Sequence, residues 1–486
     1  MNKTEEIFKV NLNNLDFRYD VFQMINIFYP FSTIQFVEAD FNLKVEVYEE
    51  KILVKDNKKE EEFTIDMEHK VKEEIRKAVF NFLTKETGKK LPWGTLVGIR
   101  PSKKALELLE KGYSEKEIIE VFKRKHETSE DKAKLCIEVA KYEKNIVNNE
   151  ENKISIYLGM PFCPTRCLYC SFTSNPIGGC KSLVEPYLES LSKEIKALSK
   201  YISEHSLIIE SVYFGGGTPT AIDDDQFHQV MKDIYEHFIR NKNIKEFTVE
   251  CGRPDSITQS KLKSMKNYKV QRISINPQTM NDNTLKLIGR NHTARDAVDK
   301  FLMARELGFD NINMDMIVGL PGEGLKEIDR TCNELLKLNP DSITIHGMSI
   351  KRASKLYENI INNKTYEIPE QQELNQMYEA TSALAEKLQM IPYYMYRQKN
   401  MVGNMENLGY SKKGKEGIYN IQMIEERQTI IALGADAVSK IIFLEENRIE
   451  RFGNVKDVKE YINRIDEMIK KKVELLDTLY KSYKIK

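Results

Sequence analysis

Three cysteines at short spacing are the residues of this chain best suited to chemistry. Cys163, Cys167 and Cys170 form a C-x₃-C-x₂-C pattern. Thiolates are soft ligands that suit iron–sulfur clusters or zinc. Three ligands complete neither a tetrahedral zinc site nor a four-cysteine cluster, but they leave one iron of a [4Fe–4S] cluster open to an external ligand. The alternative is a zinc site completed by a remote Cys or His.

The other four cysteines are scattered along the chain, at Cys136, Cys180, Cys251 and Cys332. We expect each of them to be a small buried apolar side chain. An odd total of seven cysteines in a 486-residue chain does not favour a disulfide scaffold.

A glycine-rich segment, YFGGGTPT, spans residues 213–220 and includes Gly217 and Thr218. Three successive glycines let a backbone approach a ligand without obstruction by Cβ atoms, although a purely structural turn is the alternative. Four further polar residues occur within or after apolar runs: Glu250, Gln278, Arg290 and Asp315. An Asp inside an apolar strand needs a partner, and a structural pair between Asp315 and Arg290 is one explanation.

These residues fall on a regular alternation of strands and helices. Strand-like apolar runs occur at 154–160, 211–217, 246–252, 272–278, 311–319 and 342–350. Amphipathic helical segments separate them, at 182–203, 224–240, 295–307 and 324–338. Six such units predict an α/β fold with a parallel sheet, and their even spacing favours a partial (β/α)₆ TIM-type barrel over a doubly wound sheet. In either fold the ligand lies at the C-terminal ends of the strands.

The sequence predicts three parts. Residues 1–150 form an N-terminal α+β accessory domain, with strand character at 33–47, a hairpin around Asp56-Asn57, a helix at 69–84, a structured loop at 91–103 and a helix from the N-cap Ser129 to about Asn148. Residues 151–360 form the core barrel. Residues 361–486 form a mainly helical C-terminal domain that covers the substrate and ends in a helix at about 455–480.

Composition narrows the function. The chain is 41% hydrophobic and 30% charged, with 74 basic and 74 acidic residues. It can therefore bury a large core, and its balance of charge excludes general capture of nucleic acid. No apolar run approaches the roughly 18–20 residues that span a bilayer, so we expect no membrane insertion. The first ten residues lack the apolar stretch of a signal peptide, which favours a cytoplasmic location.

The cysteine motif after the first barrel strand, with Tyr169 before its last cysteine, resembles that of the radical SAM superfamily. The resemblance implies that Cys163, Cys167 and Cys170 hold a [4Fe–4S] cluster. It also implies that S-adenosyl-L-methionine chelates the open iron and yields a 5′-deoxyadenosyl radical on reductive cleavage. The superfamily fold is a partial (β/α)₆ barrel, in agreement with the alternation above.

Within that superfamily the chain looks like the oxygen-independent coproporphyrinogen III oxidases. The segments LPWGTLVGIRPSK, TVECGRPDS, ISINPQTMND, PYYMYRQKNM and ENLGY resemble the HemZ-type subgroup over nearly the whole chain. The resemblance implies no catalytic side chain beyond the cluster and the adenosylmethionine site. It places around adenosylmethionine the residues Tyr157, Tyr169, Gly217, Thr218, Glu250, Gln278, Arg290 and Asp315.

The resemblance implies an oxidoreductase of heme biosynthesis. Such an enzyme decarboxylates two propionates of coproporphyrinogen III to vinyl groups, giving protoporphyrinogen IX, with reduced flavodoxin or ferredoxin as electron donor. Phe172 stands where the established decarboxylases have a fourth cysteine, and the first 150 residues differ from theirs. A heme chaperone without decarboxylase activity and a radical enzyme that modifies another tetrapyrrole are therefore the alternatives.

The substrate residues are sought in the C-terminal part. Arg397, Lys399 and Asn400 follow the tyrosine-rich stretch 393–396, and a flat tetrapyrrole with carboxylates would need aromatic surface and cations. A packed loop at the barrel mouth is the alternative. His292 and His346 are candidates for contact with substrate or heme iron, with a structural role as the alternative.

Overall fold

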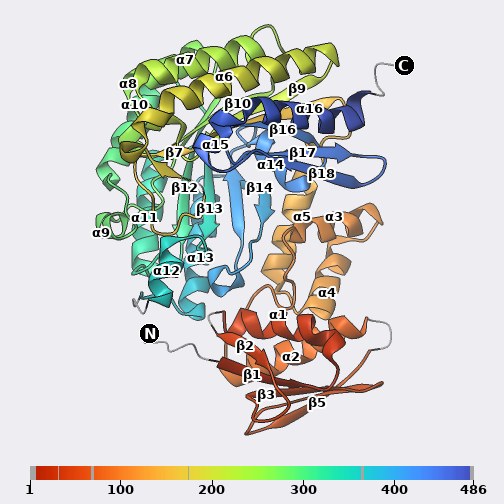
Figure 1. Cartoon of the computed structure of the whole chain (residues 1–486). Helices are drawn as coiled ribbons and strands as arrows, with labels where there is room; N and C mark the ends of the chain where they lie inside the picture. The colour runs from red at the N-terminus through yellow and green to blue at the C-terminus, as the bar shows by residue number, and fades with distance from the viewer. Residues whose placement is uncertain (1–6, 31, 67–69, 173, 363–365, 482–486) are drawn as a thin grey trace.

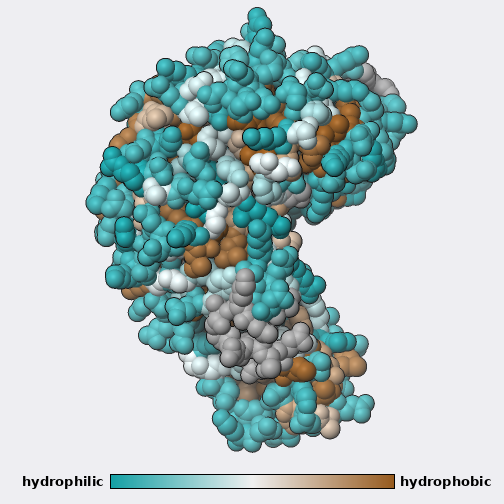
Figure 2. Space-filling view, turned by 60° about the vertical axis from the view of Figure 1, so that its left-hand side comes forward, coloured by the Kyte–Doolittle hydropathy of each residue, from teal (hydrophilic) through white to brown (hydrophobic). Residues whose placement is uncertain are grey.

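The computed structural model describes residues 7–30, 32–66, 70–172, 174–362 and 366–481. In this part of the chain the strands form a five-stranded sheet, an 11-stranded sheet and a two-stranded sheet. The large sheet and its helices make the upper body in Figure 1, and the five-stranded sheet lies at the opposite end of the molecule. The face seen in Figure 2 is largely hydrophilic, with hydrophobic residues in separate areas.

Six neighbouring parallel strands form the centre of the large sheet, in chain order. They are β6 (Lys153–Met160), β9 (Ile208–Gly216), β10 (Glu246–Gly252), β11 (Arg272–Ile275), β12 (Ile312–Val318) and β13 (Ser342–Gly347). Helices on the outside connect them: α6 (Lys181–Glu204), α7 (Asp224–Ile234), α8 (Gln259–Asn267), α9 (Asp282–Leu287), α10 (Ala294–Glu306) and α11 (Leu325–Leu338). The predicted α/β barrel is confirmed, and each of its six strands overlaps the run predicted for it.

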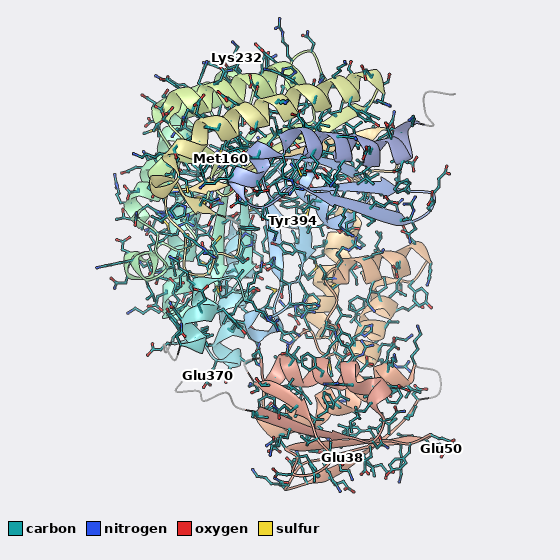
Figure 3. The ribbon with its side chains drawn as sticks, viewed as in Figure 1. Glu38, Glu50, Met160, Lys232, Glu370 and Tyr394 are labelled. Carbon is teal, nitrogen blue, oxygen red and sulfur yellow. The ribbon has the colours of Figure 1, made fainter. Side chains whose placement is uncertain are left out.

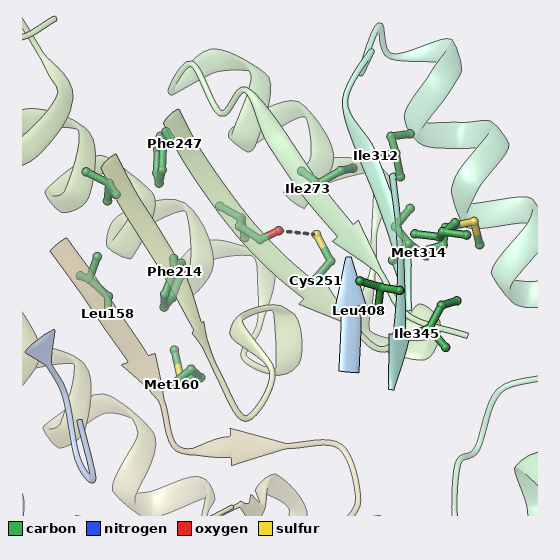
Figure 4. Close-up of a cluster of buried hydrophobic side chains, with 14 of the residues drawn as sticks. Leu158, Met160, Phe214, Phe247, Cys251, Ile273, Ile312, Met314, Ile345 and Leu408 are labelled. Atoms are coloured by element: carbon green, nitrogen blue, oxygen red, sulfur yellow. Dashed lines mark hydrogen bonds between the residues drawn. The ribbon is translucent and has the colours of Figure 1, made fainter. Parts of the chain in front are cut away.

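The barrel strands have two chemically different faces. Successive side chains of a strand point to opposite sides of the sheet. One set packs in the hydrophobic core and includes Leu158, Phe214, Ile273, Met314 and Ile345 (Figure 4). The residue beside each of these lines a central cavity instead: Tyr157, Tyr213, Ser274, Asp315 and His346. The strands therefore present a polar surface to the interior of the barrel.

The C-terminal part extends the sheet at both edges. Its helices are α13 (Gln371–Lys387), α14 (Ile418–Glu425), α15 (Val458–Asn463) and α16 (Ile465–Tyr480). Its strands are β14 (Ile391–Tyr396), β15 (Asn407–Ser411), β16 (Thr429–Leu433), β17 (Val438–Phe443) and β18 (Arg448–Gly453). β15 pairs antiparallel with β13, and β16 pairs parallel with β6. Helices hold more of its residues than strands do, as expected, but the five added strands were not anticipated.

The N-terminal part contains two packing units. β1 (Ile7–Leu12), β2 (Thr33–Phe36), β3 (Leu43–Val47), β4 (Lys51–Lys55) and β5 (Glu60–Thr64) form the five-stranded sheet with α1 (Arg18–Phe28) and α2 (Val71–Thr87). β4 and β5 form the predicted hairpin. This unit has its own core, which ends at Leu91.

The helices α3 (Pro101–Glu110), α4 (Glu115–His126) and α5 (Glu130–Glu143) pack instead in the barrel core, together with Trp93. The division of the core therefore lies near residue 92 and not at the expected boundary of 150. Ser129 is the N-cap of α5, but its side chain makes no capping hydrogen bond, and the helix ends at Glu143, five residues before the expected end.

Candidate functional site

A cavity of about 660 Å³ lies inside the barrel at the C-terminal ends of its strands. Met160, at the end of β6, and Tyr394, on β14, both line it and are labelled near the middle of the molecule in Figure 3. All eleven residues predicted for the cluster and adenosylmethionine line this cavity: Cys163, Cys167, Cys170, Tyr157, Tyr169, Gly217, Thr218, Glu250, Gln278, Arg290 and Asp315.

The three motif cysteines come together because backbone hydrogen bonds fold their loop tightly. Cys163 belongs to β7 (Phe162–Cys163), directly after β6. The Cys170 N–H donates to the Cys167 carbonyl at 3.2 Å. Cys163 and Cys167 are buried and Cys170 is half-buried, and all three are free thiols.

Polar groups lie beside the sulfur atoms. The Thr218 hydroxyl donates to Cys163 Sγ at 3.4 Å, and Arg253 donates to Cys167 Sγ at 3.8 Å. Burial raises the pKa of Cys163 to about 11, so iron would displace a proton from this thiol on binding. In the described ranges, no three or more His, Cys, Asp or Glu side chains are arranged to hold a metal ion. A [4Fe–4S] cluster fits the loop because each thiolate binds a different iron.

The glycine-rich segment packs directly against the cysteine loop. A Cβ atom on Gly217 would lie 2.7 Å from the Phe162 carbonyl oxygen and 2.9 Å from Cys163 Sγ. Gly216 has a φ of +100°, in the region that favours glycine. The backbone of this segment therefore closes one wall of the cavity beside the thiols, where a side chain has no room.

Two carboxylates of the cavity have different environments. Burial raises the pKa of Glu250 to about 7, and the charge of Asp315 adds to this rise. Its hydrogen-bond donor is the Tyr213 hydroxyl, at 3.1 Å. Burial acts in the same direction on Asp315, but hydrogen bonds and the charge of His346 outweigh it and lower its pKa. Asp315 accepts from Asn313 at 2.6 Å and lies 3.4 Å from His346 Nε2.

The postulated pair between Asp315 and Arg290 does not form. Arg290 donates to the Tyr169 hydroxyl at 3.1 Å and to the Asn276 carbonyl at 2.7 Å, and so orients the tyrosine next to Cys170.

Gln278 has a φ of +68°, and its backbone bridges to β12 at Met316. The buried Oε1 of Gln278 has no hydrogen-bond partner, which is the arrangement expected of an atom that binds a ligand.

Several residues of the cavity were not predicted as site residues. Two of them are Tyr213 and Tyr419. Their rings stack with that of the predicted Tyr157, with ring centroids 6.2 and 6.1 Å apart. Further unpredicted lining residues are Arg272, Asn313, Thr344 and Lys351, whereas Tyr394 and Tyr396 belong to the tyrosine-rich stretch considered as aromatic surface for the substrate. Alternating polar residues within the barrel strands are the sequence signal that identifies most of them. His346, weighed as a candidate, does line the cavity, whereas His292 is buried outside its lining.

The prediction of the substrate residues must be corrected. None of Arg397, Lys399 and Asn400 lines the cavity. Arg397 is 3% exposed. Its guanidinium donates to the Leu96 and Asn404 carbonyls and lies 4.9 Å above the Trp93 ring. Lys399 and Asn400 are exposed. The packed-loop interpretation therefore holds for Arg397.

The other cysteines lie outside the cavity lining. Cys136, Cys251 and Cys332 are buried, as expected. Cys180 is half-buried, because it precedes the first turn of α6 and does not lie on a core-facing strand or helix face.

A barrel with three thiols on the loop after its first strand, open to a cavity at the strand ends, is the arrangement of a radical SAM protein. The Radical SAM superfamily profile matches residues 157–335. The oxygen-independent coproporphyrinogen-III oxidase-like protein HemZ of Bacillus subtilis is 40% identical over 413 residues, 84% of this chain and 82% of the relative. This chain belongs to that HemZ-type family of coproporphyrinogen oxidase-like radical SAM enzymes.

Two further proteins are similar to this chain. The heme chaperone HemW of Bacillus subtilis is 29% identical and aligns with 64% of this chain and 76% of its own. The solved structure of the coproporphyrinogen III oxidase HemN of Escherichia coli superposes with a TM-score of 0.51 at 19% identity, covering 68% of this chain and 72% of that one. This likeness confirms the fold.

Membership of the superfamily gives the cofactors, a [4Fe–4S] cluster and S-adenosyl-L-methionine. The donor set of the cavity agrees with both. A search of the helices in the described ranges finds none long and apolar enough to cross a membrane.

Proposed function

We propose that this protein is an oxygen-independent coproporphyrinogen dehydrogenase that converts two propionates of coproporphyrinogen III to vinyl groups. One observation carries the proposal. Three thiols, a polar set suited to adenosylmethionine and a wall of tyrosines line the same cavity. The tyrosines are Tyr157, Tyr213, Tyr394, Tyr396 and Tyr419. Tyrosine rings give a flat macrocycle apolar contact and retain a hydroxyl for its polar edge.

Cys163, Cys167 and Cys170 would hold the cluster, which together with adenosylmethionine would supply the radical chemistry that removes a hydrogen atom from the β-carbon of a propionate. Hydrogen transfer requires the two reactants to lie within van der Waals contact, and the lining residues of this one cavity would have to hold both. Glu250 and Gln278 offer oxygen acceptors to the polar groups of adenosylmethionine. His346 holds Asp315 in a fixed position through its contact at 3.4 Å.

Lys351 is our candidate for the propionate carboxylate in place of Arg397. Four other cations line the cavity, and each has partners: Arg253 with Asp255, Lys440 with Glu426, Arg272 with Ser342, and Arg290 with Tyr169. Lys351 is half-buried and pairs with no carboxylate of the described chain. Its ammonium lies 5.8 Å from the centre of the Phe172 ring, at the mouth of the cavity. An unpaired cation at this place suits an anionic side chain of the substrate.

A heme chaperone is the second candidate function. The fourth cysteine of the established decarboxylases is replaced by Phe172, whose ring is 66% exposed and offers no ligand to iron. The similarity to HemW supports the same interpretation. A chaperone would hold heme stably and leave coproporphyrinogen unchanged.

Mass spectrometry of anaerobic reactions separates the candidates. Reconstituted protein would be incubated with adenosylmethionine, a reductant and coproporphyrinogen III that carries deuterium at the propionate β-carbons. We expect a loss of CO₂ from the substrate and deuterium in 5′-deoxyadenosine, with neither in Cys167→Ala. Lys351→Met should lower decarboxylation more than adenosylmethionine cleavage. Unlabelled deoxyadenosine together with stable heme binding would replace this proposal with the chaperone function.

We further infer that the protein works in the cytoplasm. Its seven cysteines are free thiols, which a reducing compartment preserves. Retention of reduced thiols and iron in protein isolated from the cytoplasmic fraction is the corresponding test.

A further inference from the structure

The surface around the cysteine loop is built from two segments that lie far apart in the sequence. The Leu168 N–H donates to the Ile288 carbonyl, and the Leu168 carbonyl accepts from the Leu356 N–H, both at 2.9 Å. One residue of the cysteine loop therefore fixes the end of α9 on one side and the start of α12 (Lys355–Ile361) on the other. Figure 1 shows α9 and α12 on the same side of the molecule.

Five exposed residues of this surface form what we call the cluster rim: Phe172, Lys286, Leu287, Arg352 and Lys355. The two apolar side chains are large and open to solvent, with Phe172 66% and Leu287 48% exposed. Exposed apolar side chains within a polar border are typical of protein–protein interfaces.

The charge of the rim has one sign. The ion pairs found in the described chain involve none of Lys286, Arg352 and Lys355. The three segments 163–172, 286–290 and 351–358 together contain six basic residues and one acidic residue, Glu358, and five of the basic residues remain when the buried Arg290 is left out. The whole chain, by contrast, has 74 basic and 74 acidic residues. A local excess of positive charge in a neutral protein attracts an acidic partner and accelerates its association.

The rim borders the cysteine nearest to solvent. Cys170 is half-buried, whereas Cys163 and Cys167 are buried, and Phe172 is two residues beyond Cys170. A protein bound to the rim would therefore approach a cluster held by these thiols from the side nearest to solvent, at Cys170.

We propose that the cluster rim is the docking surface for an acidic one-electron donor protein. The inference rests on the radical chemistry of the proposed function and not on its substrate. In the transfer, one electron leaves the reduced donor and enters the cluster, so the donor is oxidised by one electron and the cluster is reduced by one. No bond forms or breaks, and no proton needs to move.

Charge reversal tests the surface. The rim variant would carry Lys286→Glu, Arg352→Glu and Lys355→Glu, none of which lines the cavity. The control variant would carry Lys232→Glu, Lys263→Glu and Lys459→Glu, which are exposed, have no ion pair in the described chain and lie on α7, α8 and α15. Figure 3 labels Lys232 on the outer helical layer, away from Met160 of the cavity. Both variants change the charge equally.

Titration calorimetry with oxidised flavodoxin as the probe measures docking without any turnover. We expect the wild type and the control to bind and to weaken as salt is added. The rim variant should bind at least about tenfold more weakly at low salt, with a flatter salt dependence. Equal binding by the rim and control variants would overturn the proposal, as would an equal loss in both.

Stopped-flow reduction of the cluster then separates docking from damage. With reduced flavodoxin, the rim variant should be reduced about tenfold more slowly than the control. With dithionite, a small inorganic reductant, the two rates should match. A loss of the dithionite rate as well would assign the effect to the cluster or fold, and the single variant Arg352→Glu must then still show the selective loss or the proposal fails. Failure of the proposed function gives a different result from failure of the docking proposal. In that case no variant decarboxylates the substrate, even with dithionite as the reductant.

Discussion

Two buried clusters of charged side chains in this molecule differ in how completely their polar atoms are paired. The first lies between α6 and the C-terminal part. Glu194 and Lys472 are both fully buried, with Nζ 2.5 Å from Oε1. Glu194 also accepts from the Tyr461 hydroxyl at 2.6 Å, the Asn454 amide at 3.0 Å and the Gly434 N–H at 2.9 Å. The Glu194 carboxylate is therefore fully paired, and its partners come from separate segments of the chain.

The second cluster lines the cavity, and its pairing is incomplete. Glu250 accepts from the Tyr213 hydroxyl and faces the charge of Asp315, and Gln278 Oε1 has no partner. Buried polar atoms without partners cost free energy, so they persist where a ligand completes them. In this comparison the paired carboxylate of Glu194 joins segments of the fold, whereas the unpaired oxygen of Gln278 and the raised pKa of Glu250 both lie in the cavity.

The largest expected effect is loss of the cluster. Cys163→Ala, Cys167→Ala or Cys170→Ala should abolish uptake of about four irons and four sulfides on anaerobic reconstitution, because each removes one thiolate ligand. Cys136→Ala and Cys332→Ala should keep normal content, since both thiols lie outside the cavity. Iron and sulfide analysis measures the result. Stoichiometric zinc without iron uptake in anaerobically purified protein would contradict the cluster assignment.

The closed cluster should respond to substitution through stability alone. Lys472→Met leaves the Glu194 carboxylate buried without its cation, which costs about 3–5 kcal/mol of the free energy of unfolding. Lys470→Met, an exposed position on the same helix, should change stability by about 1 kcal/mol or less. Denaturant titration gives both values. Equal effects of the two variants would show that the Glu194 pair is not a structural anchor.

The sequence predicted the barrel and the cofactor set because both depend on local signals. Strand–helix periodicity located all six strands, and short motifs located eleven of the residues that line the cavity. One added strand was missed because its partner is distant: β16 pairs with β6, some 275 residues earlier in the chain, and no local pattern reports such pairing. β17 and β18 pair locally as a hairpin that was not predicted.

The error at Arg397 has a similar cause. A cation among tyrosines fits a carboxylate ligand, but its donors point to backbone carbonyls of Leu96 and Asn404. Only the tertiary structure shows this, because residue 96 comes from the N-terminal part. Asp315 illustrates the opposite case, since its position inside an apolar strand already indicated that it needs a partner, and Asn313 and His346 provide this partnership.

The pH dependence of stability gives a smaller effect, specific to the open cluster. Glu250 has a pKa of about 7 in the folded protein, against an ordinary value of 4.5. Between these values the unfolded chain releases the proton while the folded, ligand-free protein retains it, so stability falls as pH rises. At about 1.4 kcal/mol for each pKa unit, the loss is roughly 3 kcal/mol.

Denaturant titrations between pH 4.5 and 7 test this dependence. In the wild type, the free energy of unfolding should fall by this roughly 3 kcal/mol as the pH rises to about 7. In Glu250→Gln, which has no proton to release, the fall should be smaller by the same amount. Parallel curves for the two proteins would show that Glu250 is not perturbed by burial.

The smallest expected effect is on adenosylmethionine affinity. Above about pH 7, where Glu250 is ionised, Glu250→Gln and Asp315→Asn each replace a charged acceptor by a neutral amide of the same shape. A hydrogen bond to a charged group contributes about 1.5–3 kcal/mol, so the affinity should fall roughly 10- to 150-fold. Iron content should remain normal, because neither residue binds the cluster.

Glu246→Gln is the matched control: Glu246 lies at the start of the same strand β10, is buried, and accepts from Thr248 at 2.8 Å. It lies outside the cavity lining, so its substitution should alter stability but leave the affinity of the folded protein unchanged. Anaerobic equilibrium binding of adenosylmethionine to the reconstituted variants measures the difference. If the affinity drops equally in all three variants, the open cluster does not bind adenosylmethionine, and incomplete pairing in this cavity needs another ligand to explain it.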